Sequence, residues 1–308
     1  MGNFVIVADS TCDLSKEYCE KYDINIVYGH VVFPDKGELR AFLDWEMIGR
    51  DEFYNALKAN PDGYKTSPPN MQEFYEVFEK YAQDGKDVLC MTISGGISGA
   101  PGFAMAAAKM IEEEYPNVSV KVLDTMRFGP GFGLMAVHAS MLREEGKSIT
   151  EVYDYFMTNR NRYHQAGWLD DLSFVAKKGR ITHAKAFMGT LVGMKPIGEF
   201  DGNGLTTVIG KVKGTKTAYK VLLEYIEKTI ENPQEQYIFI AHTCRYQFAE
   251  EYKALIEEKF KPKGVFINDV FPVNGINIGP GLMAAYYVGT PISDDLSKER
   301  EIIEKAQN

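Results

Sequence analysis

Residues 4–14 read FVIVADSTCDL, an apolar run at 4–8 followed directly by a polar loop at 9–13. A short, continuous apolar run is typical of a strand buried on both faces of a sheet. Ser15 then offers a helix N-cap, and residues 24–27, INIV, read as the next strand. The order strand, polar loop, helix, strand predicts a βαβ unit and therefore a parallel sheet.

The same order recurs along the first half of the chain. Its loop at 94–99, SGGISG, connects an apolar run to a helical pattern. Ser148 and Glu151 have the spacing of a capping box, which marks a helix start. The elements predicted here are helix 72–81, strand 88–93, helix 104–111, strand 118–123 and helices 132–145 and 148–162.

From about Gly167 the pattern changes. Residues 195–200 and 205–212 flank a glycine-rich turn and predict an antiparallel hairpin. The elements predicted after it are helix 215–230, strand 237–242, helix 247–259, strand 265–267 and a charged surface helix at 293–307. We therefore predict an α/β fold in two domains, an N-terminal domain at 1–165 with a parallel sheet flanked by helices and a C-terminal domain at 166–308 with a mixed sheet.

Composition narrows the function classes. The chain has 308 residues, 45% of them hydrophobic, and a net charge of -9, which argues against a nucleic-acid partner. The basic stretch KKGR at 177–180 is interpreted as a solvated turn. No charged leader and no membrane-length apolar run is seen, so a cytoplasmic protein is expected, with at most transient membrane contact.

The sequence offers no pattern for a metal or cofactor. Its four cysteines include no C-x-x-C pair, and its five histidines include no metal-binding pair. It contains no P-loop, and GPGFG at 129–133 lacks the dinucleotide fingerprint G-x-G-x-x-G. We therefore predict no metal and no cofactor.

Two loops could hold the polar head of a ligand. In the 94–99 loop, the glycines permit close approach, the N–H groups open a helix, and Ser94 and Ser98 add hydroxyls, a pattern that suits an anion. The segment TSPP at 66–69 presents hydroxyls from Thr66 and Ser67 on a backbone fixed by proline. A tight turn and a rigid helix start explain the same residues without a ligand, and both interpretations stay open.

A serine hydrolase is an alternative. GISGA at 96–100 differs from the nucleophile elbow G-x-S-x-G only in its last residue, and its Ser98 lies between a predicted strand and a helix. His183 or His242 could serve as the base. No H-G-G-G oxyanion loop is found, so this alternative rests on Ser98 alone.

Taken in order, these segments resemble the DegV family of bacterial fatty-acid-binding proteins over nearly the whole chain. The matching segments are ADSTCDL at 8–14 for D-S-T-x-D-L, TSPP at 66–69 for T-S-x-P, SGGISGA at 94–100 for S-S-x-x-S-G-T, DT at 124–125 for D-S, KGRI at 178–181 for G-R-I, KPI at 195–197 for K-P-I and GPG at 279–281 for H-x-G-P-G. Each match is weak alone, and their common order makes the resemblance strong.

The resemblance implies a non-enzymatic protein that binds one long-chain fatty acid. The carboxylate would meet Thr66 and the 94–99 loop between the domains, with Gly95 and Ser98 among the contacts, and the tail would enter an apolar tunnel. The family presents the acid to a separate fatty acid kinase for phospholipid synthesis. Tunnel candidates are Phe103, Met105, Met110, Met135 and Phe187.

The chain departs from the family's pattern at three places in the expected head-group cluster. Gly95 replaces the second serine of S-S, Asn277 replaces the histidine before G-P-G, and a basic arginine of the second domain is matched only by Lys211 or Lys213. Asparagine cannot carry the charge that histidine can, and lysine lacks the guanidinium fork. We therefore expect the site's location to persist, while its ligand or the kinase hand-off has diverged. Acyl length, unsaturation and oligomeric state are not indicated by the sequence.

Overall fold

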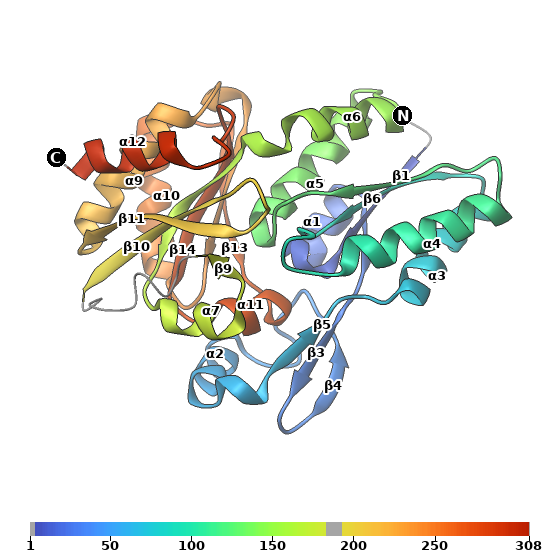
Figure 1. Ribbon diagram of the computed structural model, residues 1–308, viewed down its shortest axis with the longest axis horizontal. Coiled ribbons are helices and arrows are strands. Elements are labelled where there is room, and N and C mark those ends of the chain that lie inside the picture. The colour runs from blue at the N-terminus through green and yellow to red at the C-terminus, as the bar shows by residue number, and fades with distance from the viewer. Residues whose placement is uncertain (1–3, 183–192, 308) are drawn as a thin grey trace. The chain divides into compact units, whose positions relative to one another are not determined.

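The computed structural model describes residues 4–182 and 193–307 (Figure 1). Contacts group the chain into two units, unit 1 with residues 1–47, 62–160 and 271–273 and unit 2 with residues 48–61, 161–270 and 274–308. The predicted single boundary near residue 165 stays a prediction. The α/β class is confirmed in both units, each of which is built on its own sheet.

A four-stranded parallel sheet forms the centre of unit 1. Its strand order is β2-β1-β6-β7, and all three neighbouring pairs are parallel. The strands are β1 (Phe4–Asp9), β2 (Ile24–Val27), β6 (Asp87–Thr92) and β7 (Val120–Asp124). Helix α1 (Lys16–Lys21) joins the first two, and Ser15 Oγ accepts the Tyr18 N–H as its cap. The predicted βαβ start is therefore confirmed.

Helices cover both faces of this sheet. Helices α3 (Met71–Ala82) and α4 (Ala100–Glu114) pack on the face where Val5 and Val7 point, in one apolar cluster. Helices α5 (Gly129–Glu144) and α6 (Ile149–Asn159) contact the strands on the other face. The predicted capping box of Ser148 and Glu151 is confirmed at the start of α6. Burial on both faces explains why the strands read as continuous apolar runs.

A second, small sheet of unit 1 was not predicted from the sequence. It has the order β4-β3-β5 and is antiparallel throughout. Its strands are β3 (His30–Phe33), β4 (Gly37–Arg40) and β5 (Lys65–Ser67), each of three or four residues. Strands this short give little periodic signal. The sheet matters because Thr66 lies on β5.

Unit 2 contains a mixed, seven-stranded sheet of order β13-β12-β14-β8-β10-β11-β9. The pairs β12–β13 and β11–β9 are parallel, and the others are antiparallel, including the predicted hairpin of β10 and β11. The strands are β8 (Tyr163–Leu169), β9 (Ile181–Thr182), β10 (Met194–Phe200), β11 (Thr206–Lys213), β12 (Tyr237–His242), β13 (Gly264–Asp269) and β14 (Leu282–Val288). The predicted mixed sheet is confirmed.

Helices α9, α10 and α12 pack against this sheet. The α-helices not yet given are α2 (Arg50–Ala59), α7 (Leu172–Lys178), α9 (Thr215–Thr229), α10 (Tyr246–Phe260), α11 (Pro272–Ile278) and α12 (Ser297–Gln307). Across the described ranges, no helix combines the length and the apolar character needed to cross a membrane.

Candidate functional site

The strand order of unit 1 reverses between β1 and β6. From β1 the chain passes to β2 on one side, whereas β6 and then β7 lie on the other. Ligands of open α/β sheets bind beyond the carboxyl ends of the strands at such a reversal. The 9–13 loop follows β1 and the 94–99 loop follows β6, so both polar segments stand at this position. We take the 94–99 loop as the candidate site.

Three backbone N–H groups around Ser94 have fixed partners. The Ile93 N–H donates to Asp9 Oδ2 at 2.7 Å, and the Gly95 N–H donates to Asp124 Oδ2 at 3.1 Å. The N–H of Ser94 itself donates to the carbonyl of Arg127 at 2.9 Å. The peptides on both sides of Ser94 are therefore each held by a carboxylate, and its own N–H is held by a carbonyl of the loop between β7 and α5.

The loop's remaining hydrogen bonds are made within the loop. Ser94 Oγ accepts the Gly96 N–H at 3.1 Å, and Ser98 Oγ accepts the Ala100 N–H at 3.2 Å. The Ile97 N–H donates to the Ser94 carbonyl at 3.2 Å. The sequence predicted that the loop's N–H groups face an anion, but those of Gly95 and the three residues just named already have acceptors. The donors that remain for a ligand head are the Ser94 and Ser98 hydroxyls and the N–H groups of Ser98 and Gly99, which have no acceptor among the described residues.

The side-chain hydroxyl of Ser94 can still donate a hydrogen bond. Its side chain is fully buried, and a hydroxyl that accepts one hydrogen bond still carries a proton to donate. Among the described residues, none accepts that proton. A buried donor without an acceptor is costly, so this hydroxyl is the strongest local indication of a ligand.

The Asp124 carboxylate packs against Gly95 in the space that a side chain would occupy. A Cβ placed on Gly95 would lie 2.7 Å from Asp124 Oδ2, closer than real side chains approach. The serine that the family pattern expects here would therefore displace the carboxylate that accepts the Gly95 N–H. Glycine at position 95 thus lets Asp124, which the family pattern also has, stay where it accepts the Gly95 N–H.

Thr66 lies on β5, where it pairs with Val31 of β3 and is half-buried. Residues on either side of it are tightly placed. A Cβ on Gly29 would lie 2.6 Å from the Ser67 carbonyl oxygen and 3.3 Å from Pro69, so this glycine lets β3 pass close to the TSPP segment. The segment is thus built into a sheet and is more than the rigid helix start of the simpler interpretation.

The candidates in unit 2 lie on different elements. Asn277 is half-buried on α11, and Lys211 is exposed on β11, where it pairs with Pro196. Gly210, the preceding residue, packs against Ile303 of α12. Because successive strand residues point to opposite faces, Lys211 points away from α12.

The K-P-I and G-P-G segments meet at Asp170, which the sequence analysis missed. Asp170 Oδ1 is bound by Lys195 Nζ and by Trp168 Nε1, the latter at 3.1 Å, and Oδ2 accepts Arg245 Nε at 2.7 Å. Gly281 has φ 104°, and a Cβ there would lie 2.9 Å from Asp170 Cβ. Burial alone would raise the pKa of Asp170, but the bonds from Lys195 and Arg245 lower it overall. These motif residues therefore have a structural role.

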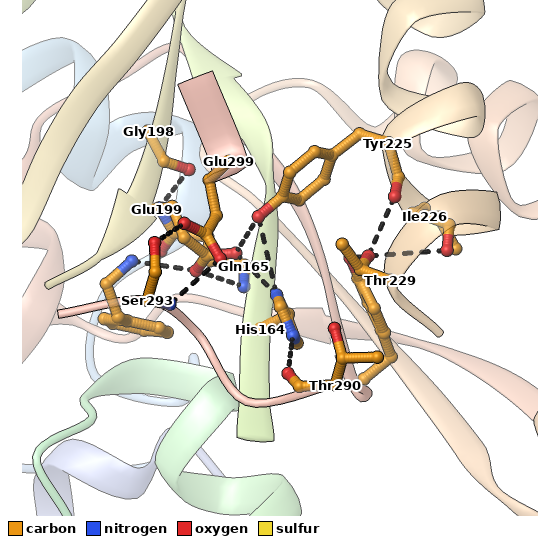
Figure 2. Close-up of polar contacts among 12 residues, drawn as sticks. His164, Gln165, Gly198, Glu199, Tyr225, Ile226, Thr229, Thr290, Ser293 and Glu299 are labelled. Carbon is orange, nitrogen blue, oxygen red and sulfur yellow. Dashed lines mark hydrogen bonds and ion pairs between the residues drawn. The ribbon is translucent and has the colours of Figure 1, made fainter. Parts of the chain in front are cut away.

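A second polar cluster of unit 2 is sealed (Figure 2). Glu199 Oε1 accepts the N–H groups of Gln165 and Phe200, and Oε2 accepts the Tyr225 hydroxyl, each at 2.8 Å. His164 Nδ1 lies 2.9 Å from Oε2, and its Nε2 lies 2.7 Å from the Thr290 carbonyl oxygen. The side chains of His164 and Glu199 have no exposed surface, so the cluster is a core element.

The residues proposed for other roles are also placed. Phe103, Met105 and Met110 are 41–51% exposed on α4, so we do not assign them to a buried tunnel, whereas Met135 is fully buried on α5. Phe187 and His183 lie outside the described residues. Within the described part of unit 1, no histidine is hydrogen-bonded to Ser98, and the described residues contain no cluster of metal-binding side chains.

Comparison with known proteins decides the family. The model of the DegV family, described as uncharacterised proteins, matches residues 3–290. The chain belongs to the DegV family. A DegV domain-containing protein of Clostridium perfringens is 33% identical over 291 residues, covering 94% of this chain and 98% of the relative.

Solved structures of DegV proteins have the same fold. A fatty-acid-binding DegV family protein of Thermus thermophilus has a TM-score of 0.82 at 25% identity and covers 93% of this chain and 99% of its own. A stearic-acid-binding protein of Eubacterium ventriosum has a TM-score of 0.79 at 24% identity and covers 93% and 98%. The predicted resemblance to the DegV family is confirmed.

Within a DegV chain, Asp9, Asp124 and Arg127 gain roles that the sequence analysis did not assign. The first two end their strands and hold the peptides beside Ser94. Arg127 is only 2% exposed and supplies the carbonyl for the Ser94 N–H. The available signal was positional, since each aspartate directly follows an apolar strand and Arg127 comes three residues after the second.

Proposed function

We propose that this DegV protein binds a long-chain fatty acid whose carboxylate accepts hydrogen bonds from the Ser94 and Ser98 hydroxyls, with Thr66 completing the head-group contacts. The observation that carries the proposal is the buried Ser94 hydroxyl, whose proton has no acceptor among the described residues. The Thermus DegV protein, which binds a fatty acid, and the Eubacterium protein, which binds stearic acid, support the class of ligand. Asn277 and Lys211 remain predicted contributors to the same head group.

The tail and the carboxylate of a fatty acid contribute differently to the binding free energy. About ten buried methylenes at ~0.8 kcal/mol each give about 8 kcal/mol of gross driving force. Burying a carboxylate costs several kcal/mol unless donors replace its water. The hydroxyls would therefore offset desolvation and select the acid, while the tail supplies most of the affinity.

Identification of a bound molecule tests the proposal directly. The purified protein is denatured, and released small molecules are identified by mass spectrometry, before and after incubation with palmitate. We expect one acyl chain per protein. No acyl species in either sample would overturn the fatty-acid proposal, and a different co-purified anion would establish the diverged ligand that Gly95 and Asn277 suggested.

Substitution of Thr66 tests the head-group assignment. Thr66→Ala removes a hydroxyl and is expected to weaken palmitate binding about fivefold, the size of one hydrogen bond of about 1 kcal/mol. Thr217→Ala, at an exposed position of α9, is the matched control and should leave affinity unchanged. Equal affinities for both variants would remove Thr66 from the site.

The proposal includes hand-off of the acid to a separate fatty acid kinase, as the DegV resemblance implies, with the chain itself non-catalytic. The kinase would transfer the γ-phosphoryl group of ATP to the carboxylate, giving acyl phosphate and ADP. Hydroxylamine converts acyl phosphate to a hydroxamate that can be counted. We expect hydroxamate only when protein, acid, kinase and ATP are all present, and formation without this protein would contradict the hand-off.

The hydrolase alternative keeps one simple test. Ser98 Oγ is occupied by the Ala100 N–H and has no histidine partner in the described part of unit 1, so we expect no reaction with a fluorophosphonate. Labelling that is lost in Ser98→Ala would favour catalysis over binding.

A further inference from the structure

We infer that Asp9 and Ser10 are positioning residues that set the two head-group segments, the 94–99 loop and the Thr66 strand, from one turn without touching the ligand. The inference rests on the proposed function and deepens it. It assigns a role to the D-S-T turn, which the candidate site itself leaves unexplained.

Asp9 fixes the 94–99 loop. Its side chain is fully buried, Oδ1 accepts both the N–H and the hydroxyl of Thr11, and Oδ2 accepts the Ile93 N–H at 2.7 Å. The last bond joins residues 84 positions apart, across the strand reversal between β1 and β6. Ile93 directly precedes Ser94, so the carboxylate determines where the Ser94 hydroxyl points.

Ser10 fixes the other segment. Its fully buried Oγ accepts the Gly29 N–H at 3.2 Å. Gly29 in turn lies against the Ser67 carbonyl, where an added Cβ would be only 2.6 Å away. The neighbouring pair His30 and Ser67 begins the β3–β5 ladder that carries Thr66. Adjacent residues of one turn therefore connect to both segments that are expected to hold the carboxylate.

An amide cannot replace the Asp9 carboxylate. Each of its two oxygens receives a donor, from Thr11 on one side and Ile93 on the other. Asparagine offers one oxygen and one NH₂ group, so one of those donors would face another donor. Asp9→Asn keeps the shape of the side chain and disturbs one of the two bonds, which makes it the sharpest variant.

The chain also provides a matched control. Asp87, at the opposite end of β6, accepts the Ser119 N–H at 2.8 Å and so ties β6 to β7 by the same kind of bond. Asp87→Asn removes an equivalent aspartate–backbone contact far along the strand from Ser94. Asp87→Asn therefore tests the loss of an aspartate–backbone bond in this sheet away from Ser94.

The experiment compares the affinity for palmitate with that for methyl palmitate, by displacement of a fluorescent apolar probe. Bonds to a charged carboxylate are stronger than bonds to a neutral ester. We expect Asp9→Asn to weaken palmitate binding about tenfold, with less than a twofold change for the ester. Asp87→Asn should change neither, and hydrogen exchange of the Ile93 amide should accelerate only in Asp9→Asn.

The outcomes separate the inference from the proposed function. Failure of the wild-type chain to bind palmitate would overturn the function and this inference with it. Binding by the wild type, together with equal losses for acid and ester in Asp9→Asn, would overturn the positioning role alone. Should Asp9→Asn not fold, Ser10→Ala removes a single bond and is expected to weaken palmitate about threefold and spare the ester. No selective loss in Ser10→Ala would then contradict the inference.

Discussion

Two loops of this molecule have the same topological origin, one in each unit. Each connects a buried strand to a helix, and the parallel strand that follows ends in an aspartate. In unit 1 the 94–99 loop joins β6 to α4, and β7 ends at Asp124. In unit 2 the 243–245 loop joins β12 to α10, and β13 ends at Asp269. By position alone, either could bind a ligand.

Their hydrogen bonds differ. Thr243 uses its N–H and carbonyl with Leu282 and Gly281, each at 3.0 Å, and its hydroxyl accepts the Leu282 N–H at 2.8 Å. Thr243 is thereby bonded three times to Gly281 and Leu282 at the start of β14, although its hydroxyl, like that of Ser94, still carries a proton to donate. In the other loop, the Ser94 hydroxyl keeps its proton beside exposed glycines. The comparison teaches that exposed glycines beside a buried donor, more than topology or the donor alone, distinguish a binding loop from a connecting one.

Among the described residues of unit 2, the buried Nε2 of His242 has no hydrogen bond. His242 accepts the Arg245 N–H at Nδ1, which leaves the proton on Nε2, 4.0 Å from Asp269 Oδ1. Burial lowers the pKa of His242 to about 4, against the opposing effect of Asp269, so the ring is neutral near pH 7. A single donor facing a carboxylate already paired with Arg50 does not form a head-group site.

Substitution of Glu199 is expected to have the largest effect, and it tests whether the fully bonded polar cluster of unit 2 serves stability rather than binding. Glu199→Gln puts an NH₂ group where a donor is already present, so we expect a loss of about 3–5 kcal/mol in the free energy of unfolding. Urea unfolding measures it. Glu227→Gln, in an exposed pair with Lys259, should cost less than about 1 kcal/mol. A loss below about 1 kcal/mol for Glu199→Gln would show that a satisfied buried network contributes no more than a surface pair.

Acid should destabilise unit 1 through His138. Burial lowers its pKa from 6.5 to about 4, and its ring packs edge-on against Tyr155. The unfolded chain binds the proton more readily, so stability is full above pH 6.5 and falls as the pH drops toward 4. The total is about 3 kcal/mol, at about 1.4 kcal/mol for each pH unit.

The variant His138→Phe tests this dependence. Urea unfolding at about pH 7 and about pH 4 should show a pH-dependent loss smaller by about 3 kcal/mol than in the wild type. Tyr155→Phe alters the same contact but keeps the titrating ring, so its pH dependence should match the wild type. Identical pH dependence in all three proteins would contradict the buried, neutral state of His138.

Sequence patterns predicted the parts of the fold that depend on local chemistry. The apolar runs of unit 1 became buried parallel strands, and Ser148 capped its helix as expected. Strand β8 was missed because His164 and Gln165 interrupt its apolar pattern, and their burial depends on partners far along the chain, among them Glu199, 34 or more residues away. Tertiary hydrogen bonds of this kind have no signature in a local window.

The candidate site, like the fold, was predictable only where it depends on local sequence. The glycines and serines of the 94–99 loop were visible in the sequence. The bond from Ile93 to Asp9 was not, because it joins residues 84 positions apart. Nor could sequence reveal that the loop's own serines would consume the N–H groups of Gly96 and Ala100. Local composition therefore located the loop, and long-range bonds define what it can offer a ligand.

Ser94→Ala would sharpen the comparison between the two loops. Removal of the unspent donor is expected to weaken palmitate binding about tenfold and to lower stability by about 1 kcal/mol, through the lost acceptor for Gly96. Thr243→Ala should show the reverse, with a similar or larger stability loss and unchanged affinity. Competition binding and urea unfolding of the two variants measure both quantities. Equal affinity losses would mean that the exposed glycines beside Ser94 do not separate the loops.

Gly95→Ser is expected to have the smallest effect, and it tests whether this DegV chain has lost a head-group contact or replaced it. The new side chain must displace Asp124 Oδ2, which lies 2.7 Å from the added Cβ, and this weakens the bond to the Gly95 N–H. The added hydroxyl offers one new donor, so gain and loss oppose each other. We expect palmitate affinity to change by less than about threefold, since single neutral hydrogen bonds contribute about 1 kcal/mol.

Gly102→Ser, where an added Cβ meets open space one turn into α4, is the control for adding a serine. A tenfold gain in Gly95→Ser alone would show that the missing hydroxyl was a loss that Asp124 does not replace. In that case the head group of this chain's natural ligand would differ from a simple carboxylate. A small change would instead show that the acid site does not depend on a hydroxyl at position 95.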